Sequence, residues 1–168
     1  MSSYYLLINR YGFVNSEGDF GMTEKLYNTI VVGTDGTECA QKAVITAIEL
    51  SKLVGAKLHV IYVSDVSNIT PTSVEWELVA ENIRMESEKA FEFARERSAA
   101  ENIDFETVSL SGAAGQEMVA YANKINADLI VVGATGKKAF ERLILGSVSE
   151  KVIRNAKKQV LVVRSDDA

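Results

Sequence analysis

Short runs of consecutive apolar residues alternate along this chain with longer segments in which apolar residues recur every three or four positions. The short runs are rich in β-branched residues and occupy positions 29–33, 57–64, 104–110, 128–133 and 159–164. Runs of this length and composition are typical of β-strands. Because most of them are continuously apolar, the pattern favours strands that are buried on both faces of a parallel sheet.

The longer segments predict helices at 37–54, 74–101, 115–124 and 147–155. In the longest helix one apolar stripe faces inward and glutamates cover the solvated side; the stripe consists of Trp76, Val79, Ile83, Ala90 and Ala94. Strands and helices therefore alternate from residue 28 onward, which predicts an α/β fold. Right-handed crossovers place helices on both faces, so we expect a single doubly wound parallel sheet of five strands.

Residues 1–27 follow neither period. Gly12, Gly18 and Gly21 interrupt a mixture of tyrosine, asparagine and serine. Three interpretations are open for this segment: a flexible arm, an additional edge strand near residues 4–8, and an artefact of expression or of the assigned start, with Met22 as the natural beginning. The predicted globular domain spans residues 28–168.

Composition narrows the class of protein. A chain of 168 residues is long enough for one domain with a substantial core. The net charge of −5 and the lack of a basic cluster give no field that would attract nucleic acid. No apolar run approaches the roughly 18–20 residues of a membrane-spanning helix. The single cysteine, Cys39, cannot form an intramolecular disulfide, so we expect a cytoplasmic protein that neither spans a membrane nor binds nucleic acid.

Ligands of parallel α/β sheets bind beyond the carboxyl ends of the strands, so the residues that follow the strands are the candidates. Gly133 and Gly136 follow the strand at 128–133, and Gly146 and Ser147 open the last helix. A helix N-terminus presents free N–H groups and a positive dipole end, and glycine lets an anion approach the backbone. These segments predict a phosphate cradle, although each glycine alone also fits an ordinary turn and each serine an ordinary helix cap.

The sequence lacks the residues that other phosphate-binding and catalytic motifs require. A Walker A loop would need glycine at position 131, which is valine, and a dinucleotide fingerprint is missing after the first strand. The covalent aspartyl route of haloacid-dehalogenase phosphatases would need an aspartate at position 33, which is glycine. His59 lies inside a strand and is interpreted as structural, and Cys39 has no visible catalytic partner. One histidine and one cysteine make no recognisable zinc site.

The segment DLIVVGATGKKAFERLILGSVSEKVIRNAKKQVLVVR at 128–164 resembles the C-terminal signature of the universal stress protein family. ATP-binding members show glycine, two residues, glycine, nine residues, then glycine and serine or threonine, and this chain has that spacing. TIVVGTDGTECAQKAV at 29–44 and the strand at 58–65 are similar to the family's first two strands. The resemblance covers about residues 28–165 and implies a Rossmann-like, adenine nucleotide alpha hydrolase-like sheet with strand order 3-2-1-4-5.

The resemblance also implies a set of site residues. Thr34 and Asp35 would lie near the adenosine and Val63 would contact adenine; ribose and phosphates would be held by Gly133, Gly136, Gly146, Ser147 and Ser149, with a backbone amide from Val148. The chain departs from the family at Gly33, where many members carry proline or another small residue, and at Lys137 and Lys138. Asp35 also fits a plain turn, Val63 a plain core residue, and the two lysines a solvated loop.

The function implied by the resemblance is that of an ATP-binding regulatory dimer of the stress response, with Mg²⁺ as a candidate companion ion and at most slow hydrolysis. The apolar edge strand at 159–164 would pair with its copy and make a homodimer. The alternatives are a true ATPase or nucleotidyl-transferring enzyme, a nucleotide-independent interaction module, and a sensor of AMP or another signalling nucleotide. The protein partner and the inducing stress are not readable from the residues.

Overall fold

The computed structural model describes residues 6–9, 12–14, 20–21, 25–65, 75–134 and 145–164. Five parallel strands form the main sheet: β4 (Thr29–Gly33), β5 (Lys57–Ser64), β6 (Phe105–Ser111), β7 (Leu129–Gly133) and β8 (Gln159–Val163). Their order is β6-β5-β4-β7-β8, which is the predicted 3-2-1-4-5 arrangement. We call the end where these strands begin the amino pole, and the end where they finish the carboxyl pole.

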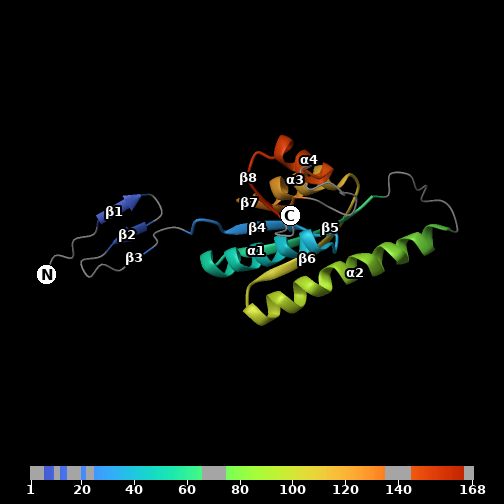
Figure 1. Ribbon diagram of the computed structural model, residues 1–168, viewed down its shortest axis with the longest axis horizontal. Coiled ribbons are helices and arrows are strands. Elements are labelled where there is room, and N and C mark those ends of the chain that lie inside the picture. The colour runs from blue at the N-terminus through green and yellow to red at the C-terminus, as the bar shows by residue number, and fades with distance from the viewer. Residues whose placement is uncertain are drawn as a thin grey trace.

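Four helices cover the sheet: α1 (Glu38–Val54), α2 (Glu75–Glu101), α3 (Ala114–Lys124) and α4 (Ser147–Asn155). Figure 1 shows α1 and α2 on one face and α3 and α4 on the other. The predicted bounds differ from these by at most one residue at either end of an element. At the start of α1 the reason is visible, because Thr37 is the N-cap, whose hydroxyl accepts from the Ala40 N–H, and so stands just outside the helix.

Period-two alternation along the strands divides the core into two halves. Ile30, Val32 and Val131 point to the side of α1 and α2, whereas Val31, Ile130 and Val132 point to the side of α3 and α4. All six are at most 2% exposed. The continuous apolar runs predicted from the sequence therefore reflect a sheet that is buried on both faces.

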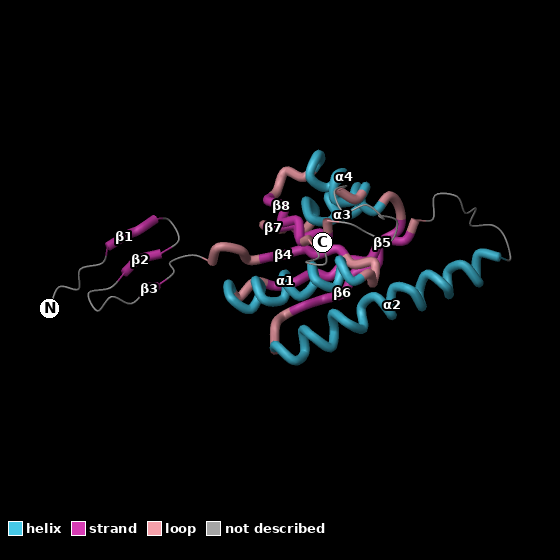
Figure 2. Tube along the Cα trace, viewed as in Figure 1, coloured by secondary structure: helices cyan, strands magenta, loops and turns pink. Residues whose placement is uncertain are grey.

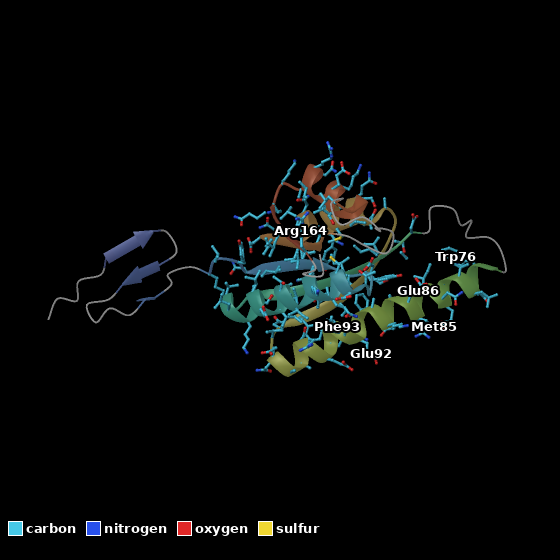
Figure 3. The ribbon with its side chains drawn as sticks, viewed as in Figure 1. Trp76, Met85, Glu86, Glu92, Phe93 and Arg164 are labelled. Carbon is cyan, nitrogen blue, oxygen red and sulfur yellow. The ribbon has the colours of Figure 1, made fainter. Side chains whose placement is uncertain are left out.

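The glutamates of the longest helix lie on its solvated side, as predicted: Glu81, Glu86, Glu88, Glu92 and Glu96 are all exposed. The opposite stripe is buried at Ala90 and Ala94 and half-buried at Trp76, Val79 and Ile83. Figure 3 shows Trp76, Met85 and Glu86 along the first half of α2 and Glu92 and Phe93 in the second half.

A second, antiparallel sheet lies within residues 1–27. It consists of β1 (Leu6–Asn9), β2 (Gly12–Val14) and β3 (Phe20–Gly21) in that order. One interpretation of this segment is an extra edge strand near residues 4–8. A strand is present at Leu6–Asn9, but it belongs to this separate sheet and not to the main one. Figure 2 shows the small sheet beyond the amino pole of the main sheet.

No helix among the described residues is long and apolar enough to cross a membrane.

Candidate functional site

The loop after β4 is a turn that bonds to itself. The Asp35 carboxylate accepts from the Thr37 N–H at 3.0 Å and from the Thr37 hydroxyl at 2.6 Å. The Thr34 hydroxyl oxygen accepts from the Gly36 N–H at 3.2 Å, and Gly36 has φ +76°, a conformation that favours glycine. Asp35 therefore has the turn-forming role that the sequence also allowed, and it stands at the carboxyl pole directly before α1.

The two glycine-bearing segments predicted to meet in space do meet, at their described ends. The Gly146 N–H donates to the Ala134 carbonyl at 2.7 Å, which places the start of α4 beside the end of β7. The Ser149 hydroxyl donates to the Gly133 carbonyl at 2.5 Å and is itself buried. Gly136, Lys137 and Lys138 lie outside the described residues.

The first turn of α4 has backbone donors without a partner inside the helix. The first bond within the helix runs from the Glu150 N–H to the Gly146 carbonyl at 2.9 Å, so the N–H groups of Ser147, Val148 and Ser149 have no partner inside the helix. Gly146 is the N-cap and contributes no side-chain bond. This helix end, with the positive end of its dipole, can hold an anion.

The requirement for glycine differs between the two glycines of this region. A Cβ on Gly133 would lie 3.1 Å from both the carbonyl oxygen and the Sγ of Cys39, so packing against α1 requires a small residue there. Gly146 has φ −64° and ψ 151°, a conformation that any residue adopts. Its backbone conformation therefore does not demand glycine.

Val63 and Ser64 end β5 at the same pole. β5 extends beyond β4, because Gly33 pairs with Ile61, so Val63 reaches the level of the Thr34–Asp35 turn. Its side chain is half-buried among the residues on the α3 side of the sheet. We refer to Thr34, Asp35, Val63, Gly133 and the segment 146–149 together as the carboxyl-pole site.

Sequence reasoning missed the neighbours of this site. The Tyr62 hydroxyl donates to the Glu86 carboxylate of α2 at 2.9 Å. Burial, and then this hydrogen bond, raise the pKa of Tyr62 to about 12, with a smaller contribution from the charge of Asp35. On the other face the thioether of Met118 fills the space above Gly33, 2.7 Å from where a Cβ would lie. No pattern in the sequence joins these residues, because each pair comes from separate elements.

His59 has the structural place that the sequence predicted. It is buried in β5, and its Nδ1 lies 2.8 Å from the Glu106 carboxylate and 3.1 Å from the Tyr121 hydroxyl. Lys57 reaches the other carboxylate oxygen of Glu106 at 2.9 Å. This cluster (Lys57, His59, Glu106 and Tyr121) lies at the amino half of the sheet, away from the carboxyl-pole site. Among the described residues no group of three or more His, Cys, Asp or Glu is arranged to hold a metal.

A parallel α/β sheet with an open helix N-terminus at its carboxyl pole is the architecture of many phosphate-binding domains. The model of the universal stress protein family matches residues 26–164, and the chain belongs to this family. A universal stress protein of Methanocaldococcus jannaschii is 39% identical over 163 residues, which are 96% of this chain and 95% of that protein.

Solved structures agree with this assignment. Universal stress protein UspA from Lactobacillus plantarum superposes with a TM-score of 0.73 at 28% identity and covers 82% of this chain and 98% of its own. A universal stress protein solved in complex with cAMP is 31% identical with a TM-score of 0.61, and covers 82% of this chain and 97% of its own. The Archaeoglobus fulgidus protein solved in complex with dAMP is 25% identical with a TM-score of 0.57, and covers 82% of this chain and 98% of its own.

Proposed function

We propose that this protein binds an adenine nucleotide at the carboxyl-pole site, with ATP as the expected ligand. The observation that carries this proposal is the hydrogen bond from Gly146 to Ala134. It holds the N-terminus of α4 at the end of β7, where three N–H groups of the first turn without a partner inside the helix could bind a phosphate. Mg²⁺ would be held mainly by the phosphates, as is usual for this ion.

The adenosine side of the site is expected at the neighbouring strands. The Thr34–Asp35 turn and Val63 end β4 and β5 at the same level. A half-buried valine offers an apolar wall for a base, and a carboxylate is a natural acceptor for ribose hydroxyls. The complexes of two relatives with cAMP and with dAMP support an adenine ligand here.

The same two complexes favour a second candidate, a sensor of AMP or of a cyclic signalling nucleotide. A nucleoside monophosphate would need only the α4 N-terminus for its single phosphate, whereas ATP would need further donors for its other two phosphates. A nucleotide-independent interaction module is the third candidate, and it would leave the open first turn of α4 without a ligand.

We further propose that the protein acts as a regulatory homodimer through β8. Val160 to Val163 are half-buried although β8 is an edge strand that pairs only with β7 among the described strands. Pairing with a second copy would satisfy this edge. Nucleotide occupancy then biases the dimer or a contact with a partner protein in the cytoplasm. Hydrolysis is expected to be at most slow, because Asp35 is engaged in its turn and the described residues of the carboxyl-pole site include no other general base.

The first experiment is mass spectrometry of the nucleotide carried by the purified protein, followed by calorimetric titration with ATP, ADP, AMP and cAMP. ATP binding at micromolar concentration, about −8 kcal/mol, supports the main proposal. A preference for AMP or cAMP supports the sensor, and no binding of any of them refutes both.

The variant that tests the location is Gly146→Val, which places a side chain in the space assigned to the phosphate. Loss of one or two charge-assisted bonds predicts an affinity reduced by roughly 100-fold. Ala113→Val is the matched control, because Ala113 is the exposed N-cap of α3 with a similar extended backbone, φ −76° and ψ 110°. Equal affinities in the two variants would remove α4 as the phosphate site.

A further inference from the structure

The small sheet β1–β3 lies outside the part of the chain that the family model matches, residues 26–164. The three solved structures named above each align with 82% of the chain, and residues 28–164 alone make up that share. These alignments therefore do not require the small sheet. The Methanocaldococcus jannaschii relative covers 96% of the chain. The first 27 residues are about 16% of the chain, so an alignment that omits only 4% includes most of them. The segment is therefore shared with at least one relative.

A sheet of this size needs a partner. Its strands have four, three and two residues, and a sheet so small is not stable in water without packing against something else. The register aligns Leu6 with Val14 and Val14 with Phe20 in one row, and Leu7 with Phe13 in the next. Successive rows belong to opposite faces, so both faces of the sheet carry apolar positions. Figure 1 shows the sheet apart from the layers of its own domain.

Residues 25–28, which join this segment to the main domain, are fixed at the amino pole. Lys25 donates to the carbonyl of Gly55, which ends α1, at 2.6 Å. The Tyr27 hydroxyl donates to the side chain of Gln159, the first residue of β8, at 2.7 Å. The N–H of Asn28 donates at 2.8 Å to the carboxylate of Asp128, directly before β7. The chain thus leaves the domain beside the start of β8, opposite its own carboxyl-pole site.

In a two-fold dimer through β8, part of the partner protomer lies next to residues 25–28. Two copies of one edge strand related by a two-fold axis have to pair antiparallel, because only antiparallel strands exchange equivalent hydrogen bonds. The start of β8 in one protomer then lies beside the end of β8 in its partner. The amino pole of each protomer, with its small sheet, is adjacent to the carboxyl pole of the other.

The carboxyl pole offers a surface for apolar side chains at this place. Leu145 and Val148 lie on either side of Gly146 and are each 36% exposed, so two large apolar side chains stand together at the surface of this pole. We propose that the β1–β3 sheet of one protomer docks on the partner's Leu145 and Val148 and covers the partner's carboxyl-pole site. To cover its own site, the sheet would have to double back across the helices on either face. This inference rests on the β8 dimer proposed above.

Cross-linking between two different chains tests the proposal. Cys39 is first replaced by alanine, and Asn9→Cys is then co-expressed with a differently tagged chain that carries Glu150→Cys. Asn9 ends β1, and Glu150 is exposed in the first turn of α4 and is not part of the site. A short bis-maleimide is expected to join the two tagged chains, because each reactive pair is formed between protomers. The product is identified on a denaturing gel and by peptide mass spectrometry.

Two further variants sharpen the result. Leu145→Ser, on the chain with Glu150→Cys, should lower the cross-linking yield by about tenfold, a loss of roughly 1.4 kcal/mol of docking energy. Ile153→Ser is the matched control: Ile153 is 45% exposed on the far half of α4 and should leave the yield unchanged. An equal loss in both variants would contradict docking at Leu145.

Sedimentation of the same sample separates the possible failures. A dimer without a cross-link between the chains, or with a cross-link only when both cysteines are on one chain, overturns this inference and leaves the β8 dimer standing. A monomer overturns the β8 dimer and this inference together. Nucleotide binding is not needed for any of these readouts, so the proposed ligand is tested independently.

Discussion

Strand β6, at one edge of the main sheet, mixes polar and apolar residues, whereas β8 at the other edge carries four apolar residues in a row. Two of the polar side chains of β6 have partners on β5. Glu106 binds Lys57 and His59 of β5, and Ser111 lies 3.2 Å from the Ser64 hydroxyl. On β8 the residues Val160 to Val163 are half-buried against the two halves of the core.

The two edges therefore differ in how open they are to pairing with another chain. An edge strand with charged and polar side chains is protected against pairing with another chain, and an apolar edge strand is not. If this contrast governs assembly, changes at β8 should have the largest effect, and changes in packing and in surface charge should have smaller effects on stability.

The largest effect is expected from Val162→Pro. The Val163 carbonyl accepts from Ala134 of the loop after β7, so the backbone groups of Val162, one residue before, face the free edge. Proline there removes an outward N–H and leaves the β7–β8 ladder intact. Each protomer would lose one hydrogen bond to its partner, together about 1–3 kcal/mol, so the proposed dimer should dissociate up to roughly 100-fold more readily, as measured by analytical ultracentrifugation.

Ser109→Pro is the control at the other edge. Leu58 donates to Asp104 and Gly112 donates to Ser64, so the even-numbered backbone groups of this segment face β5 and those of Ser109 face outward. This variant should leave the oligomeric state unchanged. Dissociation in both variants, or in neither, would contradict the contrast between the edges.

A smaller effect is expected where the β8 side of the sheet is packed most closely. In Gly133→Ala the new Cβ lies 3.1 Å from the Cys39 carbonyl, which cannot move without moving α1. Overpacking of this kind should lower the free energy of unfolding by about 1–3 kcal/mol in urea titrations. Gly33→Ala is the matched change: it meets only the flexible end of Met118, so it should cost less. A larger loss in Gly33→Ala would refute this account.

At the β6 edge, Glu106→Ala removes the carboxylate that Lys57 and His59 share. The side chain of Glu106 is 43% exposed, so solvent screens the pair, and the loss should be only about 0.5–1 kcal/mol of unfolding free energy. Glu88→Ala, which breaks the exposed pair with Arg95, is the control and should cause no measurable loss. Equal losses would mean that the buried His59 contributes nothing to the cluster.

The smallest effect concerns pH and His59, the only histidine of the chain. Burial lowers the pKa of His59, and the charge of Glu106 opposes this only in part. The unfolded chain then binds a proton at higher pH than the folded one, so stability is full above the ordinary pKa of 6.5 and declines as the pH falls below it.

The hydrogen bond from Lys57 holds the pKa of Glu106 below its usual value of 4.5, which adds a second decline only below that value. Urea titrations between pH 7.5 and 5 of the protein and of His59→Leu measure the first decline. It should vanish in the variant. A decline of equal size in both would assign it to other groups.

The order of elements and most of their bounds could be predicted from the sequence. The run at 57–64 and the helix at 147–155 match their observed bounds, because apolar periodicity and turn residues are local properties of the chain. The glycine pattern also predicted that the residues after the fourth strand lie beside the start of the last helix. The hydrogen bond from Gly146 to Ala134 agrees with this prediction.

Particular contacts could not be predicted. Periodicity places Tyr62 and His59 on opposite faces of β5 but does not say that Glu86 and Tyr121 stand opposite them. Periodicity also did not indicate that Cys39 leaves no room for a side chain at position 133, or that the Ser149 hydroxyl donates to the Gly133 carbonyl.

The α/β class, the strand order through the family resemblance, and the segments that lie side by side at the carboxyl pole could all be predicted from the residues. The three-dimensional packing was needed to show which hydroxyls are already bonded, which glycines are required by packing, and which edge carries polar side chains. Alternation and helical period fix the face on which a residue lies, but its partner on that face comes from an element far away in the chain, and the packing of the layers selects that partner.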